Sequence, residues 1–144
     1  MKNLGGFCFA PQSGYHDNNR YIMLEKCTSE EKQNWFLDPV EWDVSYPLND
    51  DVKFQIKLSN KATAHLKDFS GSLMWHRTWA SGYNYWLKVV ESMPYLDEQW
   101  FVFDHRTKTI RPHADKSLAI SHYNNLDLYY YSVGVVSKYT GASN

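Results

Sequence analysis

The sequence is poor in cysteine and has no dominant charge. Two cysteines, Cys8 and Cys27, occur among 144 residues. Two thiols cannot complete a structural zinc site, and the histidines lack metal-ligand spacing, so no metal is expected. Fifteen Lys and Arg residues face sixteen Asp and Glu residues, for a formal charge of -1. No basic field is present to hold a phosphate backbone, and we expect no nucleic-acid partner.

Long hydrophobic runs are also missing. No apolar stretch approaches the roughly 18 residues of a membrane-spanning helix. The opening residues, Met1 to Gly6, contain no apolar core of an export signal. A cytosolic protein and a mature or excised domain are both compatible with this start.

Aromatic residues, by contrast, are abundant. They make up 17% of the chain, with 6 Trp, 11 Tyr and 7 Phe, and hydrophobic residues together make up 43%. That hydrophobic content excludes a disordered chain. The aromatic content exceeds the needs of one core, which predicts exposed rings of the kind that sugar-binding, ligand-binding and membrane-interface surfaces use.

Short segments with alternating apolar residues recur along the chain, separated by turn clusters, while helical periodicity is nearly absent. The segments are 52–58, 64–66, 86–90, 109–111, 117–120 and 126–130. Many short strands of period two predict an all-β barrel or sandwich. The prolines and glycines are dispersed, so residues 1–144 are expected to form a single domain.

An internal repeat organises these segments. Residues 21–36 align without a gap on residues 86–101, 65 positions later, and a weaker third copy follows 41 positions further on. The units are about 1–36, 37–101 and 102–144, the second enlarged by two inserted loops. Three units of four short strands predict a pseudo-threefold β-trefoil. The first insertion carries Trp42 and Tyr46. The second carries Trp75, Trp79 and Tyr83, which either pack over the open end of the barrel or contact a ligand.

One motif connects the repeats to a known family. Gln33-Asn34-Trp35 matches the Q-x-W signature that closes each repeat of ricin-type β-trefoil lectins, and Glu98-Gln99-Trp100 is a degenerate second copy. At 139–141, where a third copy would fall, the signature is lost. The chain thus resembles the ricin-type family over nearly its whole length. Within that family it looks most like the β-trefoil lectin module of Vibrio pore-forming cytolysins.

The resemblance carries structural expectations. The 19-residue separation of Cys8 and Cys27 is similar to the family's usual disulfide within a repeat, which implies an intact Cys8–Cys27 bond and a secreted protein. The signature residues Gln33, Trp35 and Trp100 are expected to be core residues rather than ligands, since the Trp ring is buried and the Gln amide satisfies backbone groups at a strand crossing.

The family's usual sugar positions, however, have diverged. They hold Ala10, Glu25 and Lys32 in the first unit, His65, Val90 and Asp97 in the second, and Ala119, Tyr131 and Lys138 in the third. None keeps the usual first-position Asp that accepts from the sugar hydroxyls. This departure puts the standard galactose site in doubt in every unit.

The third unit retains the best remnant of a sugar site. If Leu126, Leu128 and Tyr130 point inward, then Asp127, Tyr129 and Tyr131 project together from the other face of the strand. A carboxylate would then stand beside two rings, with polar residues in the preceding turn. The expected carbohydrate-binding residues are Asp127, Tyr129, Tyr131, His122 and Asn124. The alternative is an exposed polar strand face whose tyrosines pack on a neighbouring loop.

No common catalytic motif is present, so we expect no enzyme activity and no cofactor. The resemblance implies a lectin module for terminal galactose or N-acetylgalactosamine on host cell-surface glycoproteins or glycolipids. It would be the targeting domain of a secreted pore-forming toxin and would contact membranes only through glycans or the parent toxin. The alternative is a structural or protein-interaction β-trefoil without sugar binding.

Overall fold

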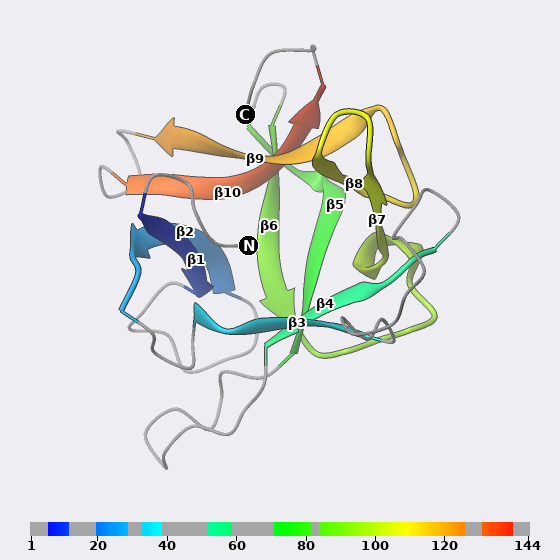
Figure 1. Ribbon diagram of the computed structural model, residues 1–144, viewed down its shortest axis with the longest axis horizontal. Coiled ribbons are helices and arrows are strands. Elements are labelled where there is room, and N and C mark those ends of the chain that lie inside the picture. The colour runs from blue at the N-terminus through cyan, green and yellow to red at the C-terminus, as the bar shows by residue number, and fades with distance from the viewer. Residues whose placement is uncertain are drawn as a thin grey trace.

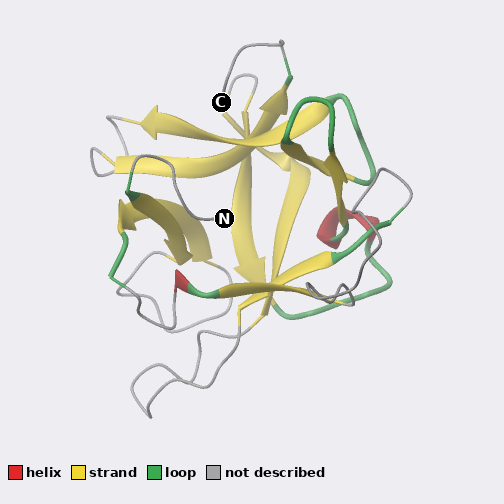
Figure 2. Cartoon of the chain, viewed as in Figure 1, coloured by secondary structure: helices red, strands yellow, loops and turns green. Residues whose placement is uncertain are grey.

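The computed structural model describes residues 6–11, 20–28, 33–38, 52–58, 71–81, 84–125 and 131–139. This part of the chain is all-β, with only short single-turn helical segments (Figure 2). The strands are β1 (Phe7–Pro11), β2 (Arg20–Lys26), β3 (Trp35–Asp38), β4 (Gln55–Leu58), β5 (Gly71–Ser81), β6 (Asn84–Val90), β7 (Phe101–Asp104), β8 (Thr109–Pro112), β9 (Leu118–Asn125) and β10 (Tyr131–Lys138). The predicted all-β class is confirmed.

Three antiparallel hairpins form the centre of the molecule. They are β1–β2, β5–β6 and β9–β10, and each joins two strands that follow one another along the chain. In Figure 1 the β9–β10 hairpin crosses the top of the view, β5–β6 runs down the middle and β1–β2 lies at the left. Hairpins pair neighbours in sequence, so their own packing does not explain why the three meet.

The second strands of the three hairpins pair with one another in a closed cycle. Tyr21 of β2 is opposite Lys88 of β6, Trp86 of β6 is opposite Val135 of β10, and Val133 of β10 is opposite Met23 of β2. One pair of shifts relates all three contacts. Residues 21 and 23 map to 86 and 88 by adding 65, and these map to 133 and 135 by adding 47. The pairing therefore repeats three times around a common centre.

Two further hairpins connect the central ones. Strand β3 pairs with β4, and β7 pairs with β8. The backbones of Phe54 and Phe101 bridge these hairpins through a reciprocal pair of hydrogen bonds of 2.9 and 2.8 Å. Both phenylalanine side chains are fully buried. This bridge brings both rings into the main core.

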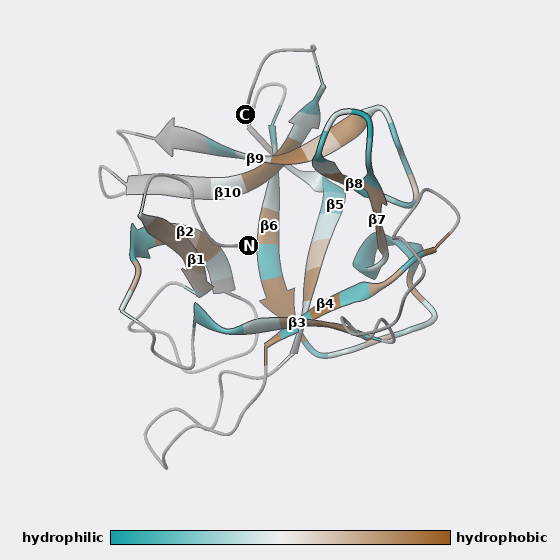
Figure 3. Cartoon of the chain, in the orientation of Figure 1, coloured by the Kyte–Doolittle hydropathy of each residue, from teal (hydrophilic) through white to brown (hydrophobic). Residues whose placement is uncertain are grey.

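The main core lies on the inner face of these strands and draws on all the central hairpins. Brown, apolar stretches mark its strands in Figure 3. Its buried members include Phe9, Ile22, Phe54, Ile56, Leu73, Trp75, Leu87, Val89, Phe101, Leu118 and Val136. The alternation of side chains along each strand explains which residues enter the core, because Tyr21 and Trp86, which adjoin the core residues Ile22 and Leu87, point to the other face.

The third unit pairs through a different segment from the one that the repeat alignment selects. The strand that completes the cycle is β10, and a shift of 47 places Gly134 where Leu87 stands, whereas the sequence alignment places Leu128 there. Gly134 leaves room for neighbouring side chains. A Cβ atom added at this glycine would lie 3.0 Å from the Phe9 ring and 3.1 Å from Ile22 Cγ2. The apolar alternation is therefore broken at an inward position, and the repeat signal is lost.

The second insertion was expected to be a loop, but part of it forms a strand. Trp75 and Trp79 lie in β5, which pairs with β6 through an irregularity between Trp75 and Ala80, rather than in an inserted loop. Trp75 is 1% exposed and belongs to the core. Met74, between two core positions, is buried as well, so burial on both faces hides the alternation that marks a strand. Trp42, Tyr46 and Tyr83 lie outside the described residues.

A smaller apolar cluster covers the outer face at the centre of the cycle. Met23, Trp86 and Val135 are buried there, with Tyr21 and Trp79 packed against them. The ammonium group of Lys88 lies 4.3 Å from the centre of the Trp79 ring and 4.9 Å from that of Tyr21. Burial against these rings lowers the pKa of Lys88. The cation–π contacts offset part of the cost of desolvating this charge.

Candidate functional site

The site expected in the third unit lies largely beyond the described residues. Asp127 and Tyr129 fall outside them, and the side chains of Asn124 and Tyr131 are not described although their backbones lie in β9 and β10. His122 is exposed, and its backbone pairs with Gly134. The expected grouping of these five residues therefore stays a prediction.

The family's usual sugar positions can be located from the strand registers. Ala10 is opposite Met23 in the first hairpin, and the corresponding partners of Lys88 and Val135 are Met74 and Ser121. The carboxylate position is thus Met74 rather than His65, and Ser121 rather than Ala119. The aromatic position similarly falls on Glu25, Val90 and Ser137. None of these six residues pairs an Asp with a ring, so the described residues contain no galactose site of the usual kind.

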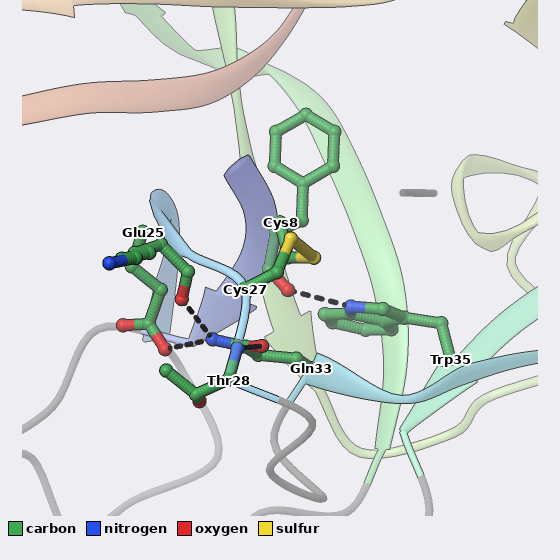
Figure 4. Close-up of a disulfide and its surroundings, with 8 residues drawn as sticks. Cys8, Glu25, Cys27, Thr28, Gln33 and Trp35 are labelled. Atoms are coloured by element: carbon green, nitrogen blue, oxygen red, sulfur yellow. Dashed lines mark hydrogen bonds between the residues drawn. A yellow bond between two sulfur atoms is a disulfide. The ribbon is translucent and has the colours of Figure 1, made fainter. Parts of the chain in front are cut away.

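Gln33 clasps the end of β2. Its Nε2 donates to the Lys26 carbonyl oxygen at 2.9 Å, and its Oε1 accepts from the Thr28 amide at 2.8 Å. The same Nε2 also donates to Glu25 Oε1 at 2.8 Å. The side chain is 4% exposed, and Figure 4 shows it next to the disulfide. A buried amide with both ends satisfied fixes the direction in which the chain leaves β2, as predicted.

Gln99 repeats this clasp after β6. Its Nε2 donates to the Glu91 carbonyl oxygen at 2.9 Å, and its Oε1 accepts from the Met93 amide at 2.8 Å. Glu91 and Met93 stand 65 residues after Lys26 and Thr28, so the two clasps hold matching backbone groups. Gln99 itself stands 66 residues after Gln33. The two units therefore differ by one inserted residue just before the glutamine, where the sequence alignment has no gap.

This one-residue shift changes which aromatic residue enters the core. Trp35 packs against the core and donates from Nε1 to the Phe9 carbonyl oxygen at 3.0 Å, as expected for a signature tryptophan. Its counterpart 66 residues later is Phe101, which is fully buried. The expectation that Trp100 is a core residue was wrong: it is half-buried, and its indole N–H donates to the Pro94 carbonyl oxygen at 2.9 Å.

The predicted disulfide is confirmed. Cys8 and Cys27 are joined by an S–S bond of 1.99 Å, with their Cα atoms 5.2 Å apart (Figure 4). By the strand registers the matching residues of the second unit are Ser72 and Ser92. Gln55 lies between these two serines, with its Nε2 3.3 Å and 3.4 Å from their hydroxyl oxygens. A hydrogen-bonded amide thus replaces the covalent link.

Gln55 also connects this bridge to the second clasp. Its Nε2 donates to Gln99 Oε1 at 2.9 Å, and both side chains are almost fully buried. The loop that follows β6 is therefore tied to β4 as well as to its own strand. Such a loop is held in one conformation before any ligand arrives.

A partly exposed group of polar and aromatic side chains stands on the outer side of this loop. We call it the Tyr95 face, and its members are Lys53, Tyr95, Asp97, Trp100 and His113. Tyr95 is 79% exposed, the largest value among the exposed large hydrophobic side chains. His113 Nδ1 donates to Asp97 Oδ1 at 2.7 Å. Lys53 Nζ lies 4.7 Å from the centre of the Trp100 ring.

The carboxylates of Asp115 and Asp104, outside the Tyr95 face, have lowered pKa values, and both stabilise the fold. The Ser117 hydroxyl and the Arg77 guanidinium, which lies 2.8 Å from Asp115 Oδ2, lower the pKa of Asp115. Burial opposes ionisation of Asp104, yet backbone amides, the Thr107 hydroxyl and the nearby Arg111 lower its pKa overall. Both carboxylates hold turns in place. No group of three metal-ligating side chains occurs in the described part of the chain.

Sequence reasoning missed the Tyr95 face because its members are spread over three segments with no common motif. A Pro94-Tyr95 turn next to a degenerate signature was the available signal. No family model, curated protein or solved structure matches this chain. Among the described residues no helix is long and apolar enough to cross a membrane.

Proposed function

We propose that this chain is a ricin-type β-trefoil lectin module. The observation that carries the proposal is the repeated glutamine clasp: Gln33 and Gln99 bond matching backbone groups in two units. The cyclic pairing of β2, β6 and β10 supports three-unit architecture, since one pair of shifts relates all its contacts. The disulfide at the family's spacing supports a secreted protein.

The proposed ligands are terminal galactose and N-acetylgalactosamine on host cell-surface glycans. The module would act as the targeting domain of a secreted pore-forming toxin, without enzyme activity of its own. Its first proposed sugar contacts are those of the third unit, with Asp127 accepting from hydroxyls and Tyr131 stacking on the ring, beside Tyr129, His122 and Asn124. A shallow site of this kind holds one sugar at about millimolar affinity, or roughly -4 kcal/mol. Membrane capture then requires several sites or several copies acting together.

Titration of the isotope-labelled domain with methyl β-galactoside and its N-acetylated analogue tests the proposal by NMR. We expect saturable shifts, and we expect Asp127→Ala and Tyr131→Ala each to abolish those of the third-unit site while leaving the denaturation midpoint unchanged. A glycan array on the pure domain identifies the preferred terminal sugar. Absence of any shift with either sugar, together with an unreactive array, would contradict the lectin proposal.

A protein-interaction trefoil is the second candidate. The observation that favours it is the loss of a carboxylate at the usual sugar positions, together with the exposure of Phe7 and Phe36 at 48% and 43%. Exposed apolar rings are common at protein interfaces. Under this alternative, Phe7→Ser and Phe36→Ser would weaken partner binding, and no sugar would compete with the partner.

A further inference from the structure

We infer that the Tyr95 face is a second sugar site, which binds a neutral hexose through Tyr95, a residue outside the family's usual sugar positions, together with Asp97 and His113. This inference rests on the proposed lectin function and assigns part of it to the second unit. An exposed ring, Tyr95, lies two residues before the carboxylate of Asp97, which is bonded to the His113 imidazole. The Trp100 indole is bonded to the carbonyl oxygen of Pro94, the residue before Tyr95. These groups meet the three requirements of a sugar site: an apolar platform, a hydroxyl acceptor and a second polar group.

The platform is Tyr95, at the tip of a tight turn. The Leu96 amide donates to the Met93 carbonyl oxygen at 2.9 Å, and Pro94 occupies the second position of this turn, where its fixed backbone angle fits. No hydrogen bond, ion pair or ring contact joins Tyr95 to another described residue, and the residue is 79% exposed, so its ring and hydroxyl are accessible to a ligand. A sugar's C–H face stacks on such a ring and removes apolar surface from water.

The turn that carries the platform is held rigidly. Trp100 anchors it by donating from Nε1 to the Pro94 carbonyl oxygen, and the Gln99 clasp fixes the Met93 amide. The backbone N–H of Gln99 donates to the Leu96 carbonyl oxygen at 3.1 Å, and this bond lies in the 3-10 helix Asp97–Gln99. A ring on such a turn loses little conformational freedom on binding, and the affinity gains accordingly.

The acceptor is Asp97, two residues after the platform. One of its oxygens accepts from His113, whereas Oδ2 makes no hydrogen bond with the described residues. Its side chain is 45% exposed, and that of His113 is 35% exposed. The His113 amide donates to the Trp100 carbonyl oxygen at 2.9 Å, so the imidazole is fixed relative to the turn. The free oxygen can accept from one sugar hydroxyl or two adjacent ones.

Charge selects the class of sugar. Asp97 and Glu98 place two carboxylates on this turn, and the ammonium of Lys53 is already engaged over the Trp100 ring. A sugar acid would meet these carboxylates, whereas a neutral hexose offers hydroxyl donors to Asp97 without repulsion. We therefore assign neutral hexoses, with galactose-type sugars as the first probe and glucuronic acid as the discriminating one.

The experiment is an NMR titration of the natural chain with methyl β-galactoside, followed at the Trp100 indole N–H and at the amides of residues 95–98 and 113. We expect saturable shifts at these groups with an affinity of about millimolar. Methyl β-glucuronide should bind at least about fivefold more weakly. Tyr95→Ala should weaken the sugar affinity about tenfold, which is the upper end of the effect expected for the loss of one ring contact. Tyr95→Phe should retain the affinity within about twofold.

Matched variants separate this site from the lectin proposal itself. Phe36→Ala removes another exposed ring, which lies in β3 and is 43% exposed against 79% for Tyr95, and should leave the shifts unchanged. Asp97→Asn keeps an acceptor for His113 and should weaken sugar binding severalfold. Shifts confined to residues 126–131, unaffected by Tyr95→Ala, would overturn the Tyr95 site while the lectin proposal stands. Absence of shifts anywhere with neutral sugars would overturn both.

Discussion

Single side chains decide how each unit of this molecule ends. Gln33 and Gln99 do the same work in two units, although one extra residue precedes the glutamine in the second unit. The physical requirement is an amide that reaches one backbone carbonyl and one backbone N–H at once. The same two hydrogen bonds therefore occur in both units, although the number of residues between the bonded carbonyl and the glutamine differs by one.

Removal of the second clasp should be costly. Gln99→Ala leaves the Glu91 carbonyl and the Met93 amide without their partner in a partly buried setting, and it leaves the buried Gln55 amide with only its longer contacts to two serine hydroxyls. At about 1–3 kcal/mol for each unsatisfied group, and with some relaxation, we expect a loss of about 3 kcal/mol or more. Urea denaturation measures it. Asn34→Ala, at an exposed position beside the first clasp, is the control and should change stability by less than about 0.5 kcal/mol.

Replacing the aromatic residues beside the two clasps with alanine should reduce stability by different amounts. Phe101→Ala should destabilise by about 3–5 kcal/mol, because the ring is fully buried. Trp35→Ala should cost about 3 kcal/mol through lost packing and the bond to Phe9. Trp100→Ala should cost only about 1–2 kcal/mol, since its ring is half-buried outside the core. Equal losses at Trp100 and Phe101 in chemical denaturation would contradict the one-residue shift between the units.

At the scale of strands and turns, the sequence predicts where strands lie better than how the units correspond. The predicted segments 52–58, 86–90, 109–111 and 117–120 all contain or meet observed strands, because alternation survives where one face is buried. It fails in β5, which is buried on both faces, and at Gly134, where neighbouring side chains fill the inward position. The alternation of apolar residues along one strand cannot reveal an inward position that side chains from other strands fill.

Close packing of strands gives a test with glycine. An added Cβ at Gly71 would lie 2.2 Å from the Val90 carbonyl oxygen, and the residue has φ of +142°. Backbone cannot move aside cheaply, so Gly71→Ala should cost about 3 kcal/mol or more. Gly134→Ala meets only side chains and should cost about 1–2 kcal/mol. Thermal and urea unfolding rank the two, and the reverse order would show that β5 and β6 do not approach as closely as described.

The ion pair between β5 and the turn at 113–117 gives the fold an acid-sensitive contact. The pKa of Asp115 is lower in the fold than in the unfolded chain, so the unfolded state binds more protons as the pH falls through about 4. Stability should therefore be complete above that pH and decline below it, and Asp104 adds to the effect in the same direction. The slope of unfolding free energy between pH 2 and 5 should flatten in Asp115→Asn. An unchanged slope would mean that neither Ser117 nor Arg77 stabilises the ionised carboxylate of Asp115.

Over the whole molecule, the three central hairpins share one core, and the first two are closed differently, by the Cys8–Cys27 disulfide and by the Gln55 bridge. The positions at which the family's usual sites carry an Asp hold Ala10, Met74 and Ser121; the first two are buried, and none of the three supplies a carboxylate to accept from sugar hydroxyls. Sequence alone selected Ala10, but it assigned the other two positions to His65 and Ala119 instead of Met74 and Ser121. It could not indicate the Tyr95 face, because Asp97 and His113 meet only after β7 and β8 fold back.

The equivalence of the units leads to a last prediction about their covalent closure. Ser72 and Ser92 occupy the places of Cys8 and Cys27, with Gln55 bridging them. The double variant Ser72→Cys, Ser92→Cys should therefore form a second disulfide on oxidation, detected by mass spectrometry with and without alkylation. Closing a loop of about 20 residues should add up to about 3 kcal/mol, less the loss of the Gln55 contacts. Reduction of the natural Cys8–Cys27 bond should remove a similar amount. Two free thiols at 72 and 92 under conditions that oxidise Cys8 and Cys27 would show that the hairpins are not equivalent there.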